Sequence, residues 1–222
     1  NLQAVSELKS RLPLKFFQID DGFEQDVGSW FEFDAEFPDG VSGLSQDIQS
    51  EGLTPGIWLA PFILEPRSKL IRRHPQWLLR DQNGRPVNSG FVWGGLGRTL
   101  DLTHPDAQGY IRDVIRTAVQ EWGFPYLKLD FLYVAALPGS HHDPTKTRAQ
   151  ILRQALELIR EEAGGETILL GCGCPIGSGI GIFDMMRISA DVSPEWEPNA
   201  FGIRKPVRNE PNMPCARNAI QN

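Results

Sequence analysis

The charged residues best placed for chemistry in this sequence are Lys128 and Asp130, which lie two positions apart in the apolar run 126–133. Side chains alternate along a strand, so these two share one face, while Leu127 and Leu129 share the other. The pair could be structural and close the end of a barrel. Because buried charges are costly unless they are paired, we favour a functional role.

A second charged pattern occurs at Arg187, Ser189 and Asp191, which share one face of a predicted strand over residues 185–191. This places a second carboxylate on a different strand from Asp130. Two such carboxylates could flank a glycosidic bond, one attacking the anomeric carbon and the other protonating the leaving oxygen.

Two further features fit a sugar ligand. Asp20 and Asp21 follow the apolar run 15–19, and Trp58 lies in the run 55–61. Carboxylates accept hydrogen bonds from sugar hydroxyls, and an indole offers a flat apolar face to a pyranose ring. Each has an ordinary alternative, because Asp-Asp-Gly is a common turn and tryptophan is common in cores.

The elements that must position these residues alternate between strand and helix. Apolar periodicity predicts helices over 2–12, 44–52, 105–122 and 143–159, with Thr103 and Asp106 capping the third and Asp143 the fourth. Strands are predicted over 15–19, 55–61, 126–133, 167–170 and 185–191. Strands separated by helices imply a parallel sheet, either doubly wound or closed as a barrel. Acidic residues at the carboxyl ends of several strands favour a (β/α)8 TIM barrel.

We therefore predict an α/β fold with one domain over residues 1–222, an incomplete TIM barrel that contains about strands 2 to 6. The segment 177–181 is glycine-rich, but it lacks a preceding strand of the right kind and a following lysine, which argues against a phosphate site. A doubly wound nucleotide-binding sheet is accordingly the less favoured alternative.

Composition excludes several classes of protein. Apolar residues make up 41% of the chain, which is too many for a disordered protein. The net charge is −6 and no Lys/Arg cluster occurs, so we expect no nucleic-acid partner. No apolar run approaches the length of a membrane span, so we expect no membrane partner.

We predict structural roles for the cysteines and for the histidine pair. The three cysteines, Cys172, Cys174 and Cys215, are too few and odd in number for a disulfide framework. His141 and His142 are adjacent and lack a spaced third ligand, so we predict a loop before a helix and no metal site.

Several motifs occur in an order that resembles glycoside hydrolase family 36, the melibiase-type α-galactosidases of clan D. The resemblance runs from about residue 14 to about residue 197. It is carried by Phe17-Gln18-Ile19-Asp20-Asp21-Gly22-Phe23, Gly56-Ile57-Trp58, Tyr126-Leu127-Lys128-Leu129-Asp130-Phe131 and Arg187-Ile188-Ser189-Ala190-Asp191. Further landmarks are His74-Pro75-Gln76-Trp77, Leu100-Asp101-Leu102-Thr103 and Gly171-Cys172-Gly173-Cys174-Pro175.

The resemblance implies a retaining hydrolase of terminal α-linked galactose. Asp130 matches the family nucleophile and Asp191 the acid/base. The residues implied to bind the sugar are Asp20, Asp21, Trp58, Lys128, Cys172 and Arg187. No cofactor and no metal are implied, and the expected substrate is an α-galactoside oligosaccharide of the raffinose or melibiose type.

Compared with the family pattern, we expect the first barrel strand, an N-terminal β-sandwich, the last strands and a C-terminal sheet domain to lie outside this sequence. We therefore expect the isolated chain to be poorly stable and inactive, because an open sheet leaves its edges unpaired. For the full-length protein we expect a cytoplasmic location and a homo-oligomer. Three alternatives remain open: a galactosyltransferase with the same pocket, a catalytically inactive sugar-binding barrel and a metal-dependent hydrolase.

Overall fold

The protein is represented by a computed structural model that describes residues 2–9, 11–199 and 213–221. The chain divides into two compact units, Asn1–Met186 and Arg187–Asn222, which are treated separately below. The helices of the first unit are α1 (Leu2–Leu8), α2 (Ser42–Ser50), α3 (Lys69–Arg73), η1 (Pro75–Trp77), α4 (Pro105–Arg116), η2 (Thr117–Glu121), η3 (Leu132–Ala136), α5 (Arg148–Ala163) and α6 (Ile176–Gly179). Its strands are β1 (Phe16–Ile19), β2 (Thr54–Leu59), β3 (Ile63–Leu64), β4 (Asn88–Val92), β5 (Gly95–Thr99), β6 (Tyr126–Leu129), β7 (Ile168–Gly171) and β8 (Met185–Met186).

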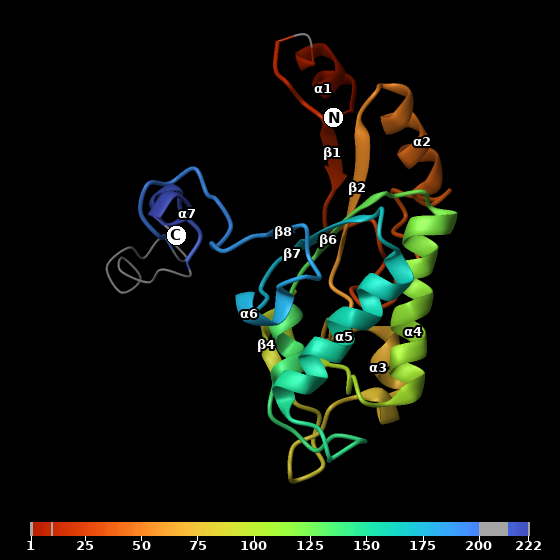
Figure 1. The fold of residues 1–222 in the computed structure, drawn as a ribbon, viewed down its shortest axis with the longest axis vertical. Helices are drawn as coiled ribbons and strands as arrows, with labels where there is room; N and C mark the ends of the chain where they lie inside the picture. Colours follow the sequence, from red (N-terminus) through yellow and green to blue (C-terminus); the bar gives the residue numbers. More distant parts are fainter. Residues whose placement is uncertain (1, 10, 200–212, 222) are drawn as a thin grey trace. The chain divides into compact units, whose positions relative to one another are not determined.

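A five-stranded sheet runs through the first unit in the order β1-β2-β6-β7-β8, and every neighbouring pair is parallel (Figure 1). This confirms the α/β fold, and each of the five strands overlaps a predicted apolar run to within one residue at its outer end. The sheet does not close into a barrel within the described residues. In the register of the central strands, Trp58 of β2 is the partner of Lys128 of β6.

The burial of β2 explains its continuous apolar run. Residues 55–59 of β2 are all buried, as expected for a parallel strand that is covered on both faces. Gly56 allows the neighbouring strand to come close, because a Cβ at this position would lie 2.2 Å from Cδ1 of Tyr126. The core around the sheet is rich in aromatic side chains, with Phe23 and Trp30 fully buried beside the strands.

Helices α4 and α5 lie side by side in the first unit (Figure 1). Both are where the periodicity predicts helix, but the predicted caps are wrong. His104 caps α4 through Nδ1, since the Thr103 hydroxyl donates instead to Asp101 at 2.8 Å. Thr147 and Gln150 form the capping box of α5.

Asp143, the predicted cap of the fourth helix, lies four residues before the actual one. Its carboxylate accepts hydrogen bonds from the backbone N–H of Thr145, at 3.0 Å, and from the Thr145 hydroxyl, at 2.6 Å. The short polar side chain therefore stabilises a local turn rather than the helix terminus.

The sequence prediction missed a second, antiparallel sheet with the order β3-β5-β4, inserted between β2 and α4. β3 has only two residues, and β4 and β5 contain glycine at Gly90, Gly95 and Gly97. Glycine has no side chain to pack and weakens the strand pattern, which is why periodicity alone does not identify these segments.

The predicted strand 185–191 is wrong beyond Met186. β8 pairs with β7 through only Leu170 and Gly171, and the structure assigns no strand to residues 187–191. Two paired residues give too few ladder hydrogen bonds to extend a strand into Arg187 and beyond. The second unit contains helix α7 (Ala216–Gln221). Among the residues described, no helix has the length and apolar character needed to cross a membrane.

Candidate active site

The predicted site residues of the first unit gather at one edge of the parallel sheet. Asp20 and Asp21 follow β1, Trp58 lies near the end of β2, and Asp130 follows β6. Because these three strands are parallel neighbours, their carboxyl ends lie at the same edge.

Asp130 is buried, with 9% of its surface exposed, and both of its carboxylate oxygens have donors. The indole N–H of Trp58 donates to Oδ2 at 3.3 Å, and the backbone N–H of Phe131 donates to Oδ1 at 2.7 Å. Phe131 has a φ of +53°, a left-handed conformation that costs about 1 kcal/mol or more for a non-glycine residue. This strained turn directs the Phe131 N–H towards the carboxylate.

Lys128 and Asp20 form an ion pair between β6 and the end of β1. The ammonium Nζ of Lys128 is 2.7 Å from Oδ2 of Asp20, and the lysine side chain is 15% exposed against 53% for the aspartate. The amide of Gln18 donates to the same oxygen at 2.7 Å, and the hydroxyl of Tyr126 donates to Oε1 of Gln18 at 3.0 Å. Burial, aided by the negative charge of Asp20, raises the pKa of Tyr126 to about 12, so this hydroxyl remains a donor at neutral pH.

Asp21 accepts a hydrogen bond from a residue that sequence reasoning missed. The indole N–H of Trp93 donates to Oδ2 of Asp21 at 2.9 Å. Trp93 is at the tip of the β4–β5 hairpin, and its ring centroid is 5.3 Å from that of Phe131. The Trp-Gly-Gly sequence at 93–95 indicates a turn, but nothing in the sequence shows that the turn reaches Asp21.

Glu24 is a second acidic residue that sequence reasoning missed. It is only 4% exposed, and within the described residues its Oε1 has no hydrogen-bond partner. Burial, together with the negative charge of Asp21 and a side-chain hydrogen bond to it, raises the pKa of Glu24 to about 8. Glu24 therefore retains its proton at neutral pH and is a neutral neighbour of Asp21.

The two cysteines after β7 differ in environment. Cys172 is fully buried, and its backbone N–H donates to the carbonyl of Leu129 at 2.7 Å, next to Asp130 in the chain. Cys174 is half-buried, and burial raises the pKa of its thiol to about 11. A thiol with this pKa is protonated at neutral pH and is a weak nucleophile.

Arg187 and Asp191 belong to the second unit, where Nη1 of Arg187 donates to Oδ1 of Asp191. The sequence prediction paired these residues by strand alternation, and that reasoning is wrong because residues 187–191 form no strand. The ion pair spans four residues of irregular chain instead. The Arg187 side chain is 28% exposed and that of Asp191 is 69% exposed.

The histidine pair at 141–142 is held by a carboxylate. Asp101 accepts from the backbone N–H of His142 at 2.6 Å and lies 3.1 Å from Nδ1 of His141. Although burial opposes it, these hydrogen bonds and those from Thr103 lower the pKa of Asp101 below its ordinary range. In the described part of the chain, no group of three or more His, Cys, Asp or Glu side chains could hold a metal ion.

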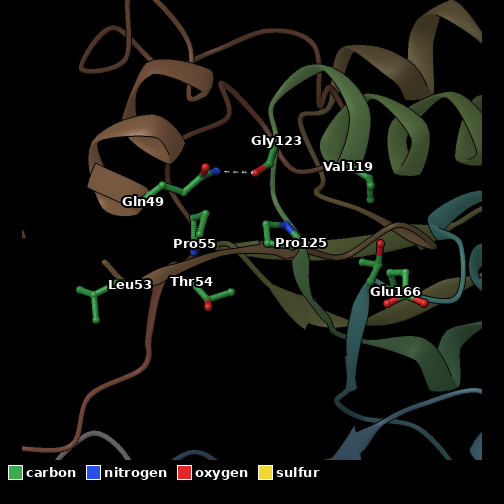
Figure 2. Close-up of a pocket in the computed structure, with 9 residues that line it drawn as sticks. Gln49, Leu53, Thr54, Pro55, Val119, Gly123, Pro125 and Glu166 are labelled. Atoms are coloured by element: carbon green, nitrogen blue, oxygen red, sulfur yellow. Dashed lines mark hydrogen bonds between the residues drawn. The ribbon is translucent and has the colours of Figure 1, made fainter. Parts of the chain in front are cut away.

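A pocket of about 540 Å³ lies at the opposite end of the strands from these carboxylates. It is lined by Gln49, Leu53, Thr54, Pro55, Val119, Gly123, Pro125, Glu166 and Thr167 (Figure 2). Thr54 begins β2, Pro125 precedes β6 and Thr167 precedes β7, so the pocket is at their amino ends. Glu166 is its one acidic group, and Gln49 donates to the carbonyl of Gly123 at 3.3 Å. One exposed carboxylate cannot act as both the acid and the base of a hydrolytic reaction. This pocket is therefore a weaker candidate for the active site than the sheet edge with Asp20, Asp21 and Asp130.

Comparisons with known proteins identify a family and several related structures. A family model described as Melibiase matches residues 1–161. The α-galactosidase TtGalA from Thermus thermophilus, solved with p-nitrophenyl α-D-galactopyranoside, is 37% identical with a TM-score of 0.85, covering 99% of this chain and 43% of that chain. The TtGalA complex with stachyose is 36% identical with a TM-score of 0.84, covering 99% of this chain and 45% of that one.

A curated relative, α-galactosidase AgaA from Geobacillus stearothermophilus, is 27% identical over 164 residues, which is 70% of this chain and 22% of that protein. The A type blood α-D-galactosamine galactosaminidase from Flavonifractor plautii is 28% identical over 179 residues, 73% of this chain and 16% of that protein. The chain thus spans about a fifth of the length of these curated relatives. The structural similarity extends over nearly the whole chain and confirms the TIM-barrel type of fold, here as an open sheet.

Proposed function

The chain belongs to the melibiase family, and from this we propose that the protein hydrolyses terminal α-linked galactose by a retaining, double-displacement mechanism. The observation that carries the proposal is the convergence of Asp20, Asp21 and Asp130 at one sheet edge. There Trp58 holds the carboxylate of Asp130 and Lys128 pairs with Asp20. Chain 1–222 then contributes part of one TIM-barrel catalytic domain.

Asp130 is the nucleophile in this mechanism. Its buried carboxylate is oriented by the N–H groups of Trp58 and Phe131, so one oxygen can attack the anomeric carbon without a search among rotamers. The bond from the anomeric carbon to the leaving oxygen breaks as the bond to Asp130 forms, which gives a covalent galactosyl-enzyme.

Asp191 is the acid/base. In the first step it transfers its proton to the leaving oxygen, and in the second it takes a proton from the water that attacks the anomeric carbon and releases Asp130. These roles require Asp191 to carry a proton in the first step and to accept one in the second.

Substrate hydroxyls are bound by the remaining site residues. Asp20 and Asp21 accept hydrogen bonds from these hydroxyls, and Lys128 and Arg187 donate hydrogen bonds to them. Trp58 and Cys172 form an apolar wall of the sugar site. An epimer with a misplaced hydroxyl would leave such groups unpaired, at about 1–3 kcal/mol for each. TtGalA, a relative at 36% identity, was solved with stachyose, which supports an α-galactoside oligosaccharide as substrate, including the raffinose and melibiose types.

The test is turnover of p-nitrophenyl α-D-galactopyranoside by the full-length protein, as wild type and as Asp130→Gly, with and without azide. Loss of the nucleophile should lower kcat by on the order of a thousand-fold or more. Azide should restore turnover by attacking the anomeric carbon from the face that Asp130 occupied. This single displacement inverts the anomeric centre and gives β-galactosyl azide. Glu166→Gly, which removes an exposed carboxylate at the other end of the strands, should be unaffected with or without azide.

A wild type that is inactive on α-galactosides contradicts the proposal, as does an Asp130→Gly variant that retains activity without azide. Product analysis with an acceptor sugar in the same assay distinguishes hydrolysis from galactosyl transfer.

A further inference from the structure

Trp93 occupies an unfavourable backbone conformation at the tip of the β4–β5 hairpin. Val92 and Gly95 are paired, so Trp93 and Gly94 form the two-residue turn, with φ values of +46° and +75°. Two-residue hairpin turns with positive φ at both positions favour Asn-Gly or Gly-Gly, because a bulky side chain is strained there. Asparagine would fit this turn better, so the turn itself does not explain the presence of tryptophan.

Trp93 contacts three segments of the proposed active site. Its indole N–H donates to Oδ2 of Asp21 at 2.9 Å. Its ring is edge-on to Trp58, with centroids 6.4 Å apart, and tilted against Phe131 at 5.3 Å. Trp58 and Phe131 are the two residues whose N–H groups hold Asp130. Trp93 therefore contacts both residues that donate hydrogen bonds to Asp130, and it donates a hydrogen bond to Asp21 itself.

Both strands of the β4–β5 hairpin are held by contacts to the rest of the first unit, and these contacts fix the position of Trp93. β5 pairs with β3, which follows β2 in the chain, and the hydroxyl of Tyr133 donates to the carbonyl of Ser89 in β4 at 3.2 Å. Tyr133 is in η3, three residues after Asp130. Both anchors connect the hairpin to the strand ends that bear the site.

We propose that Trp93 is a positioning residue, which fixes the carboxylate of Asp21 so that its other oxygen accepts a hydroxyl of the galactose. The proposal rests on the function proposed above. Without the indole N–H, the Asp21 carboxylate is free to rotate and loses a donor that offsets the cost of desolvating it when substrate binds. Trp93 acts through Asp21, so its effect should depend on the Asp21 carboxylate.

The test is a double-mutant cycle on p-nitrophenyl α-D-galactopyranoside with Trp93→Phe and Asp21→Ala in the full protein. Trp93→Phe retains an aromatic ring and loses the N–H donor. Loss of a hydrogen bond to a charged acceptor should lower kcat/KM of Trp93→Phe by about 10- to 100-fold, mainly through a higher KM. In the Asp21→Ala background, which has no side-chain acceptor, the same change should lower kcat/KM by no more than about two-fold.

Trp77→Phe is the matched control, because the indole N–H of Trp77 has no hydrogen-bond partner within the described residues. It should leave kcat/KM within about two-fold of the wild type. If Trp93→Phe does not fold, as judged by circular dichroism, the cycle is run with 3-benzothienylalanine at position 93, which replaces only the N–H by sulfur.

Equal losses in both backgrounds, or no loss in either, would overturn the positioning role while leaving an active wild type. A wild type with no activity on α-galactosides would overturn the proposed function, and this inference with it.

Discussion

Replacement of the buried acid Glu24 by glutamine should change how stability depends on pH. Burial first, and then the negative charge of Asp21, raises the pKa of Glu24 from its ordinary 4.5 to about 8. Glutamine has nearly the same shape as the protonated acid and does not titrate. The variant therefore removes the ionisation of Glu24 and leaves the packing around it nearly unchanged.

The sign follows from counting protons. Between pH 4.5 and 8 the unfolded chain has lost the Glu24 proton and the native protein retains it, so raising the pH favours unfolding. The wild type should lose about 1.4 kcal/mol for each pH unit, or about 5 kcal/mol across the whole window. The contribution is complete below pH 4.5 and has disappeared above pH 8.

The measurement is urea unfolding of the wild type and Glu24→Gln at intervals from pH 5 to pH 9. We expect the variant to gain stability relative to the wild type as the pH rises, with the difference becoming constant above about pH 8. Glu166→Gln, an exposed acid remote from this site, should show no such trend. A difference between wild type and Glu24→Gln that stays constant from pH 5 to pH 9 would refute the reasoning, because Glu24 would then be ionised throughout.

Two further predictions concern packing and loop anchoring. Gly56→Ala should destabilise the protein by about 1–3 kcal/mol in urea unfolding, since its Cβ would lie 2.2 Å from Cδ1 of Tyr126. Gly109→Ala is its control: it lies in α4 with no atom near the added methyl group, so it should stabilise by about 0.5–1 kcal/mol, and a matching loss at both glycines would contradict the steric account. Asp101→Asn should cost about 1–3 kcal/mol and speed proteolysis of the loop at 137–147, because the carboxylate accepts the N–H of His142 at 2.6 Å. An unchanged cleavage rate would show that other contacts hold this loop.

Local patterns identified most of the framework. The five parallel strands overlap the five predicted apolar runs, and helices α4 and α5 lie within or close to their predicted ranges. Strand and helix periodicity reflects which faces are buried, so these elements can be recognised without knowledge of their neighbours. The gathering of Asp20, Asp21 and Asp130 at one edge also follows from sequence, because acids that follow parallel strands share that edge.

Element boundaries and caps were decided by competing contacts. Thr103 was expected to cap α4, but its hydroxyl donates to Asp101, which also holds the loop at His142. The strand expected to continue to Asp191 ends at Met186, where pairing with β7 stops. In the first case one local hydrogen bond replaces another, and in the second the neighbouring strand no longer offers a pairing partner.

The surroundings of the carboxylates were decided only by the tertiary structure. Glu24 has an ordinary sequence context, and its raised pKa arises because the folded chain buries it beside Asp21. Trp93 is 72 residues from Asp21 in sequence, and it reaches that carboxylate through a hairpin with no clear strand pattern. The residue types and order along the chain thus determined the fold class and the acids, whereas burial and long-range hydrogen bonds, which exist only once the chain is folded, determined the charge and orientation of those acids.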